Sequence, residues 1–250
     1  ITLTTVVLFG HRLYNLLTPA WFMSAVCILA AIGTLIAASA TQLFVVWIGY
    51  SLLFGAANGL GYGYALQISA QANPHHKGLA MGLVTACYAL GAAITPFPLN
   101  IALTQFGLSA AMAGLGVMAI IIMPIIVLAY RAGDAQLELP KISQKNQNKQ
   151  YQGRAILLLW LAYGSAVTAG LMAIGHATGI AKEGGVSANL ILAAPIILAV
   201  FNMAGSLLGG WMADRFSTRI ILTALPCFSA ISLFLLSQFA VGSLILVGLA

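Results

Sequence analysis

An aspartate–arginine pair set near glycines offers the clearest chemistry in this sequence. The stretch 209–219 reads GGWMADRFSTR and joins two apolar runs. Glycine lets helices approach closely, and the carboxylate can bridge to a helix end or to a nearby arginine. Such a pair could hold one side of a membrane protein closed, or it could be an exposed ion pair that contributes about 0–1 kcal/mol. The candidates are Gly210, Asp214, Arg215 and Arg219.

Histidine and cysteine offer less chemistry than this pair. His176 follows an apolar run, where it could accept a coupling proton or lie hydrated at the mouth of a membrane path. The histidines lack the spacing along one helix that would hold a haem. The three cysteines have neither metal nor disulfide spacing and are interpreted as small buried hydrophobic residues. We therefore expect no metal, no cofactor and no enzymatic activity.

The composition places these residues in a membrane protein. Of 250 residues, 61% are hydrophobic and 6% are charged, whereas about a quarter of a soluble domain is charged. The sequence therefore predicts an all-α integral membrane protein with several spanning helices. The net charge of +6 is thinly spread along the chain, so no nucleic-acid partner is expected.

Apolar runs predict where the spanning helices lie. Seven runs are long enough to cross a membrane, and the two at the ends are cut short. A run of ten residues makes about 15 Å of helix, half of a hydrocarbon core of about 30 Å. We therefore expect the sequence to be the middle of a longer protein, with the first span missing. The runs are 1–10, 21–39, 43–69, 78–98, 107–130, 154–176, 188–209, 219–237 and 241–250.

The basic residues predict how the spans are oriented. Nine of the ten lysines and arginines lie on, or at the edge of, four alternate connections, 11–19, 70–77, 131–153 and 210–218. Basic connections stay in the cytoplasm, so we expect these four to be cytoplasmic and the protein to lie in the cell (inner) membrane. The interiors of the complete spans contain no Lys, Arg, Asp or Glu. Intramembrane charges are the usual sign of a pump or an ion path.

Two spans rich in glycine are joined by a short polar turn. Gly55, Gly59 and Gly63 fall four residues apart, so they form one stripe along a helix. Small residues at this spacing let a second membrane helix approach closely. Pro74 stops the first helix. We therefore expect a pair of spans over 55–91 with a tight connection at 73–77.

One long polar segment divides the chain. Residues 131–153 are rich in Gln, Asn and Lys and poor in aromatic residues, so a cytoplasmic central loop is expected there. An N-terminal helical bundle then occupies 1–130 and a C-terminal bundle 154–250. With one span missing before residue 1, six spans precede the loop, as in a transporter built as six plus six.

The stretch 209–219 resembles the loop signature of the major facilitator superfamily: Gly, three residues, Asp-Arg, one residue, Gly, then basic residues. Ser217 stands where the pattern has its second glycine. In that superfamily the signature recurs between the second and third spans. There this chain reads GHRLYNLLTP at 10–19, which keeps Gly10 and one basic residue and lacks Asp-Arg. The resemblance implies a secondary active transporter with the two-bundle major facilitator fold, of which this chain covers about spans 2 to 10 of 12.

A narrower resemblance covers about forty residues. The glycines at 59, 61 and 63, the run KGLAMG at 77–82 and Tyr88 look like the fourth and fifth spans of the oxalate/formate antiporter and monocarboxylate transporter group. That group usually has an aromatic pair where 71–73 read QAN here, and an arginine in the eighth span, where 189–209 carries no charge. The resemblance implies transport of a small organic anion, a mono- or dicarboxylate, by proton symport or exchange.

The superfamily also implies where substrate binds. Its central site lies near mid-membrane and is lined by spans one, four, seven and ten, with two, five, eight and eleven beside them. In oxalate-type carriers a tyrosine encloses the anion at the position matched by Tyr88. Each polar residue on these spans could instead hydrogen-bond across helices as packing. The substrate-binding candidates are Asn58, Tyr62, Thr85, Tyr88, Tyr163, Thr168 and Asn202.

Other functions compete with this interpretation. The uncharged visible spans also fit a carrier or exporter of a neutral or amphipathic compound. A membrane enzyme or haem protein predicts clustered His, Asp or Glu at membrane depth, and the sequence shows none. A structural or sensor role would leave the pattern intact and stays open. The expected partners are a small-molecule substrate, the lipid bilayer and a coupling proton, for a protein that works as a monomer.

Overall fold

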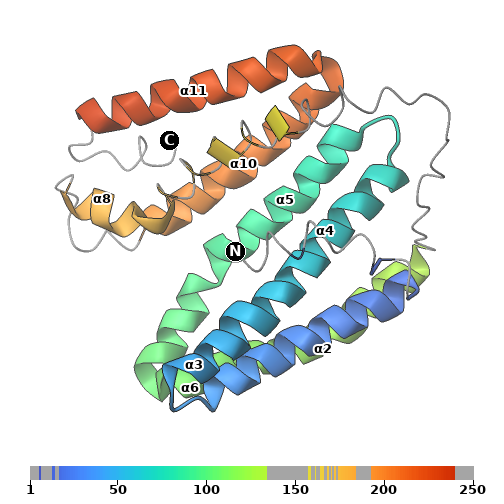
Figure 1. The fold of residues 1–250 in the computed structure, drawn as a ribbon, viewed down its shortest axis with the longest axis vertical. Coiled ribbons are helices and arrows are strands. Elements are labelled where there is room, and N and C mark those ends of the chain that lie inside the picture. Colours follow the sequence, from blue (N-terminus) through green and yellow to red (C-terminus); the bar gives the residue numbers. More distant parts are fainter. Residues whose placement is uncertain are drawn as a thin grey trace. The chain divides into compact units, whose positions relative to one another are not determined.

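The computed structural model describes residues 17–133, 174–183 and 193–239, with isolated positions at 6, 13 and 14 and between 157 and 172. Every regular element in these parts is a helix (Figure 1). The prediction of an all-α membrane fold is thereby confirmed for the described chain. Most of the predicted central loop at 131–153 and of the predicted span at 154–176 lies outside the described residues.

Five helical stretches among the described residues are long and apolar enough to cross a membrane. The stretch Lys77–Ala132 has 56 residues, about 84 Å of helix at 1.5 Å per residue, so it contains two crossings. The elements are α2 (Pro19–Ala38), α3 (Leu43–Val46), η1 (Trp47–Phe54), α4 (Gly55–Ala72), α5 (Lys77–Ile94), α6 (Pro96–Ala132), α8 (Ala177–Glu183), α10 (Ala194–Arg215) and α11 (Thr218–Phe239).

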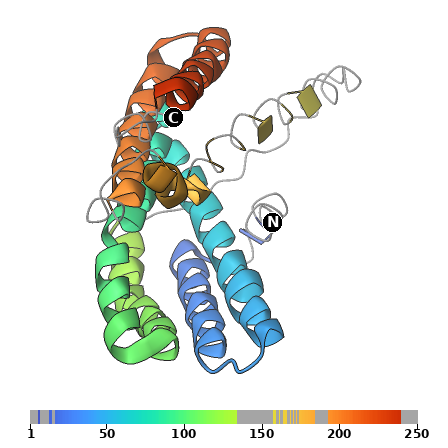
Figure 2. The same ribbon diagram turned by 90° about the vertical axis from the view of Figure 1, so that its left-hand side faces the viewer.

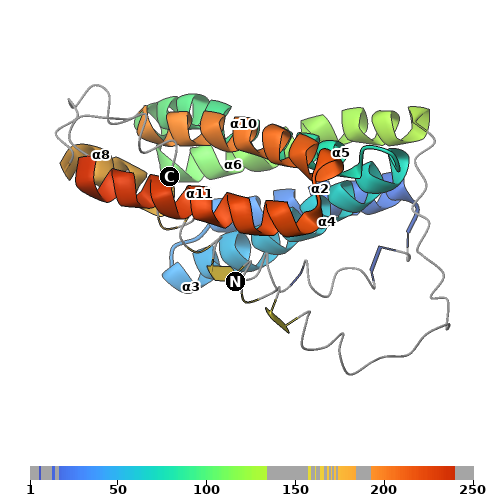
Figure 3. The ribbon, with the colours of Figure 1, turned by 90° about the horizontal axis from the view of Figure 1, so that it is seen from above.

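The chain forms two compact units. Unit 1 consists of residues 1–84 and 95–138, and unit 2 of residues 85–94 and 139–250. Within unit 2, α10 packs against α8 and α11 (Figure 3). The predicted hairpin is confirmed, because α4 ends at Ala72 and α5 begins at Lys77.

Helix α2 is the centre of unit 1. It lies between α6 on one side and the η1–α4 helix on the other (Figure 2). The fourth span is continuous over Leu43–Ala72, 30 residues, which agrees with the long run expected at 43–69. Its segment η1 is a π-helix, in which each N–H bonds five residues back and the winding is wider than in an α-helix.

Two glycines bring α2 and η1 into backbone contact. A Cβ atom added to Gly33 would lie 2.6 Å from the carbonyl oxygen of Gly49 and 2.7 Å from the backbone nitrogen of Phe54. A Cβ added to Gly49 would lie 2.6 Å from the carbonyl oxygen of Gly33. In lipid, helices are held by this kind of close van der Waals packing, since the apolar side chains gain nothing by leaving the lipid.

The other face of α2 packs on α6 next to this crossing. A Cβ on Gly116 would lie 2.8 Å from the Thr34 hydroxyl oxygen. Thr34 is buried, and its hydroxyl donates to the carbonyls of Ala30 and Ala31 at 3.1 and 3.0 Å. The hydroxyl is therefore satisfied within its own helix, and α2 presents a smooth face there.

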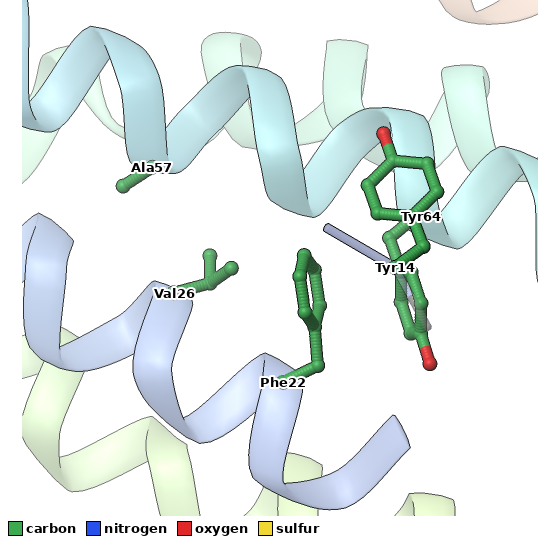
Figure 4. Packing of buried hydrophobic residues seen from close by; sticks show 5 residues of the cluster. All are labelled: Tyr14, Phe22, Val26, Ala57 and Tyr64. Atoms are coloured by element: carbon green, nitrogen blue, oxygen red, sulfur yellow. The ribbon is translucent and has the colours of Figure 1, made fainter. Parts of the chain in front are cut away.

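At the opposite end of α2, aromatic side chains form the buried core of unit 1. Phe22 of α2 stacks on Tyr64 of α4 with ring centroids 4.4 Å apart, and Tyr14 meets both rings edge-on (Figure 4). Val26 and Ala57 extend the cluster along the same two helices. Unit 1 is thus fastened at one end by backbone contact and at the other by aromatic packing.

The connection predicted at 99–106 is wrong. The residues there continue α6 as a helix, and the chain reverses at Gly107, whose φ is +82° and ψ 176° (Figure 2). This conformation is essentially restricted to glycine. The helix is therefore interrupted at a single residue where an eight-residue loop was expected, because residues 99–106 contain no glycine or proline that would end it.

Replacing Gly107 with alanine is expected to destabilise the protein by about 1–3 kcal/mol, since a side chain is strained at this φ and ψ. A Cβ there meets no atom within 4 Å, so the effect is purely one of backbone conformation. The matched control is Gly114→Ala, a helical position in α6 that is equally open. The control should be neutral or slightly stabilising. Thermal unfolding of the full-length protein in detergent tests this, and equal melting temperatures for the two variants would contradict it.

Two further predicted connections are partly helical. Helix α8 occupies most of the connection expected at 177–187, and its Ile180 N–H donates to the His176 carbonyl at 2.8 Å. Helix α10 runs on into the connection expected at 210–218, so that Phe216 and Ser217 alone separate it from α11. Both differences have one cause: polar residues at a helix end do not break the helix unless a proline or an extended residue follows.

Candidate functional site

Helix α4 carries the first pair of predicted substrate residues. Asn58 and Tyr62 lie one turn apart on α4, and both side chains are half-buried. The buried positions that face α2, Ala57 and Tyr64, lie on another face of the helix. The amide and the phenol are thus presented together, as the prediction of a shared face requires.

Helix α5 carries the second pair. Gly82, Ala86, Ala89 and Ala93 are buried and repeat at intervals of three and four residues, so they form the packed side of the helix. Tyr88 is 47% exposed and lies off this packed stripe. Thr85, one turn before it, is half-buried. Tyr88 is therefore a large, partly exposed phenol that lies off the stripe of small buried residues on α5.

The remaining candidates differ in the hydrogen bonds that their side chains make within the protein. The Thr168 hydroxyl donates to the Gly164 carbonyl at 2.7 Å, which satisfies its donor within the helix. Asn202 of α10 is exposed, and its Oδ1 accepts from the Ser206 hydroxyl at 3.5 Å. Tyr163 lies outside the described residues. Asn58 and Tyr62 belong to unit 1, while Thr85, Tyr88, Thr168 and Asn202 belong to unit 2.

The predicted signature residues gather at the end of α10 and the start of α11. Gly210 is half-buried in α10, and Asp214 and Arg215 are exposed in its last turn. Arg219 is exposed in the first turn of α11. A basic side chain at a helix C-terminus is stabilised by the partial negative charge of the last carbonyls, so Arg215 stands at a favourable place.

Arg215 has a partner that the sequence did not indicate. Its guanidinium carbon lies 4.8 Å from the ring centroid of Trp211, one turn earlier on α10, and Phe216 meets Trp211 edge-on at 6.5 Å. This is cation–π geometry, which contributes about 0.5–1 kcal/mol at an exposed site. The four-residue spacing of Trp211 and Arg215 within a helix is the signal that could have identified it.

His176 lies within a helical hydrogen-bond pattern and is exposed. Its N–H donates to the Met172 carbonyl at 3.0 Å, and its own carbonyl accepts from Ile180. The imidazole is therefore solvent-accessible, and α8 begins at the next residue, Ala177.

The electrostatics of the described helices are simple. Each charged side chain in the described residues lies within about one turn of a helix end, and the helix interiors are uncharged. Among the same residues there is no group of His, Cys, Asp and Glu that could hold a metal ion. The polar groups that these helices offer within the membrane are thus uncharged hydroxyls and amides.

Long apolar helices with charges only at their ends, the glycine crossings and the α10–α11 signature define an integral membrane protein built from spanning helices. The family model of the Major Facilitator Superfamily matches residues 2–250. The chain belongs to this superfamily, which confirms the resemblance of its loop signature. It is therefore a membrane transporter, which handles a small-molecule substrate within the lipid bilayer. No curated protein was found to match the chain.

Proposed function

We propose that this transporter moves a small organic anion, a mono- or dicarboxylate, by proton symport or exchange through alternating access. The bundles expected at 1–130 and 154–250 are the parts that move relative to one another. The protein works as a monomer in the cell (inner) membrane with its basic connections in the cytoplasm. Two observations support the proposal: the narrower resemblance over 55–91 and the position of Tyr88 on α5.

The observation that carries the proposal is the accessibility of Tyr88. The glycine-rich α4 and the KGLAMG start of α5 are helices joined by a short turn, which is compatible with the narrower resemblance. On α5 the small residues are buried, while Tyr88 is 47% exposed. A phenol that faces away from the packed stripe can donate a hydrogen bond to a carboxylate, and such charge-assisted bonds are the stronger ones.

An uncharged site is compatible with a carboxylate when a proton travels with it. An anion alone is expensive to bring to membrane depth without a cation. A monocarboxylate that crosses with a proton makes a neutral pair, which hydroxyl and amide donors such as Tyr88, Asn58 and Tyr62 can bind. His176, exposed within its helical stretch, is the proposed acceptor of that proton.

A second candidate function is transport or export of a neutral or amphipathic compound. The uncharged interiors of the described helices favour it, since such a substrate needs no countercharge. The two candidates differ in their response to a pH gradient and in the substrates that compete for uptake.

Tyr88→Phe is expected to raise the KM for the transported acid about tenfold or more, because a hydrogen bond to a charged group contributes about 1.5–3 kcal/mol. The measurement uses the full-length protein in proteoliposomes and follows uptake of labelled lactate, formate and oxalate, with and without a pH gradient. Saturable uptake that depends on the gradient and weakens in the variant is the expected result.

Tyr50→Phe is the matched control. Tyr50 is a similarly exposed phenol in η1 that stacks on Phe54 at 5.1 Å, and it is not a candidate for substrate contact. Its loss of a hydroxyl should leave uptake unchanged. If a folded protein transports none of the three acids, the organic-anion proposal is wrong and the neutral or amphipathic substrate takes its place. Equal uptake by Tyr88→Phe and the unaltered protein would remove Tyr88 from the site.

A further inference from the structure

The two halves of the chain differ at one equivalent position of their signature connections. Asp214 stands four residues after Gly210, and Tyr14 stands four residues after Gly10. When the two connections are aligned at Gly10 and Gly210, Tyr14 of the first connection corresponds to Asp214 of the second.

The structure places these two residues in opposite surroundings. Asp214 is exposed in the last turn of α10. Tyr14 is 2% exposed, with its ring 5.4 Å from Phe22 at 87° and 5.2 Å from Tyr64 at 71° (Figure 4). Tyr130, in the last turn of α6, lies 6.5 Å from Tyr64. One side chain before α2 thus packs at the point where the ends of α2, α4 and α6 meet.

The cluster is built for packing, not for binding a ligand. The hydroxyls of Tyr14 and Tyr64 are both buried, and neither has a hydrogen-bond partner among the described residues. Figure 4 shows the two oxygens pointing in opposite directions, so they do not converge on one site. Burial raises the pKa of the Tyr14 hydroxyl, because the charged phenolate would be poorly solvated there.

We propose that Tyr14 is an aromatic anchor that fastens the connection before α2 to the helices of its own unit. The two signature connections of this transporter therefore differ in their surroundings: Tyr14 of the first is held by apolar packing, whereas Asp214 of the second is exposed at the end of α10. The proposal does not depend on the identity of the substrate.

Hydrogen exchange followed by mass spectrometry tests the anchor in the full-length protein in detergent. The segment to follow is 13–22, where the Phe22 N–H donates to the Thr18 carbonyl at 2.8 Å. Local release of a segment shows as faster exchange without global unfolding. In Tyr14→Ala and Tyr14→Asp, exchange of this segment should be about tenfold faster. In Tyr14→Phe, which keeps the ring, the rate should be unchanged.

The internal control is the second connection, where the Phe216 N–H donates to the Met212 carbonyl at 2.8 Å. Its exchange rate should be the same in all three variants. If Tyr14→Ala does not fold, Tyr14→Leu keeps most of the volume without the ring and should speed exchange two- to threefold. Unchanged exchange in Tyr14→Ala or Tyr14→Leu would overturn the anchor. Full protection in Tyr14→Asp would also overturn it, because position 14 would then accept the carboxylate of the signature.

Discussion

Gly33→Ala is expected to prevent α2 and η1 from packing, with a loss of stability at or above the upper end of the range of about 1–3 kcal/mol typical of overpacked sites. The added Cβ would lie 2.6 Å from the carbonyl oxygen of Gly49 and 2.7 Å from the backbone nitrogen of Phe54. Both are backbone atoms of a helix, so no side-chain rotation relieves the contact. The fraction of monodisperse protein on size exclusion and the melting temperature in detergent measure the effect.

A double variant tests whether the cause is this particular crossing. Gly49→Ala should have a similar effect, because its Cβ would meet the Gly33 carbonyl oxygen at 2.6 Å. Once one methyl group has forced the helices apart, the second should reduce stability little further. The double variant Gly33→Ala/Gly49→Ala should therefore lose clearly less stability than the sum of the losses in the two single variants. Additive losses would show that the two glycines act at separate places. Gly114→Ala, with open space around its Cβ, again serves as the control.

Tyr64→Ala is expected to be the most damaging change in the aromatic core. Tyr64 is fully buried and contacts Phe22, Tyr14 and Tyr130 through ring packing. Truncation of a large buried aromatic side chain costs about 3–5 kcal/mol in cores that cannot collapse. The loss arises from the cavity left among α2, α4, α6 and the turn that carries Tyr14, and it should appear as a large fall in melting temperature.

Tyr64→Phe separates the ring from its hydroxyl. The oxygen is buried and has no partner among the described residues, so its removal should leave the melting temperature unchanged or raise it. A marked loss of stability in Tyr64→Phe would show that the hydroxyl makes an essential hydrogen bond. Phe97→Ala, on a ring of α6 that is largely exposed, should have little effect and controls for loss of aromatic surface as such.

The spans could be predicted because a membrane helix needs a long apolar run with charges at its ends. The run predicted at 21–39 is α2, at 19–38. Helix α4 ends at Ala72, shortly before Pro74, which was predicted to stop it. Helix ends were predicted less well. The signature at 209–219 was expected in a loop, yet Trp211 to Arg215 continue α10, since most of these residues are adequate or good helix formers and none of them is a glycine or proline.

The contacts that hold unit 1 together could not be predicted. The glycine stripe at 55, 59 and 63 drew attention because of its spacing, whereas the crossing with backbone contact uses Gly33, the single glycine of the run 21–39, and Gly49, which lies outside the stripe. A close approach depends on both helices at once, and a single sequence does not show which positions meet. Burial of Tyr14 likewise depends on Phe22 and Tyr64, which come from other segments.

The predicted site divides in the same way. That Asn58 and Tyr62 share a face, and that Tyr88 stands clear of the small buried residues of α5, follows from helical spacing, which the sequence contains. The back-bonded hydroxyl of Thr168 and the stacking of Arg215 on Trp211 depend on rotamers, which spacing leaves open. The role of these residues in transport stays a prediction.

The π-helix η1 has a geometric consequence for the fourth span. In an unbroken α-helix, Gly49 and Ala57 are eight residues apart and would point about 80° away from each other. Because a π-helix turns through a smaller angle per residue, both residues instead face α2. Rewinding η1 as an α-helix would rotate Asn58 and Tyr62 about the span axis relative to Gly49. A membrane helix with such a segment can re-aim its polar side chains by twisting, without tilting or sliding through the bilayer.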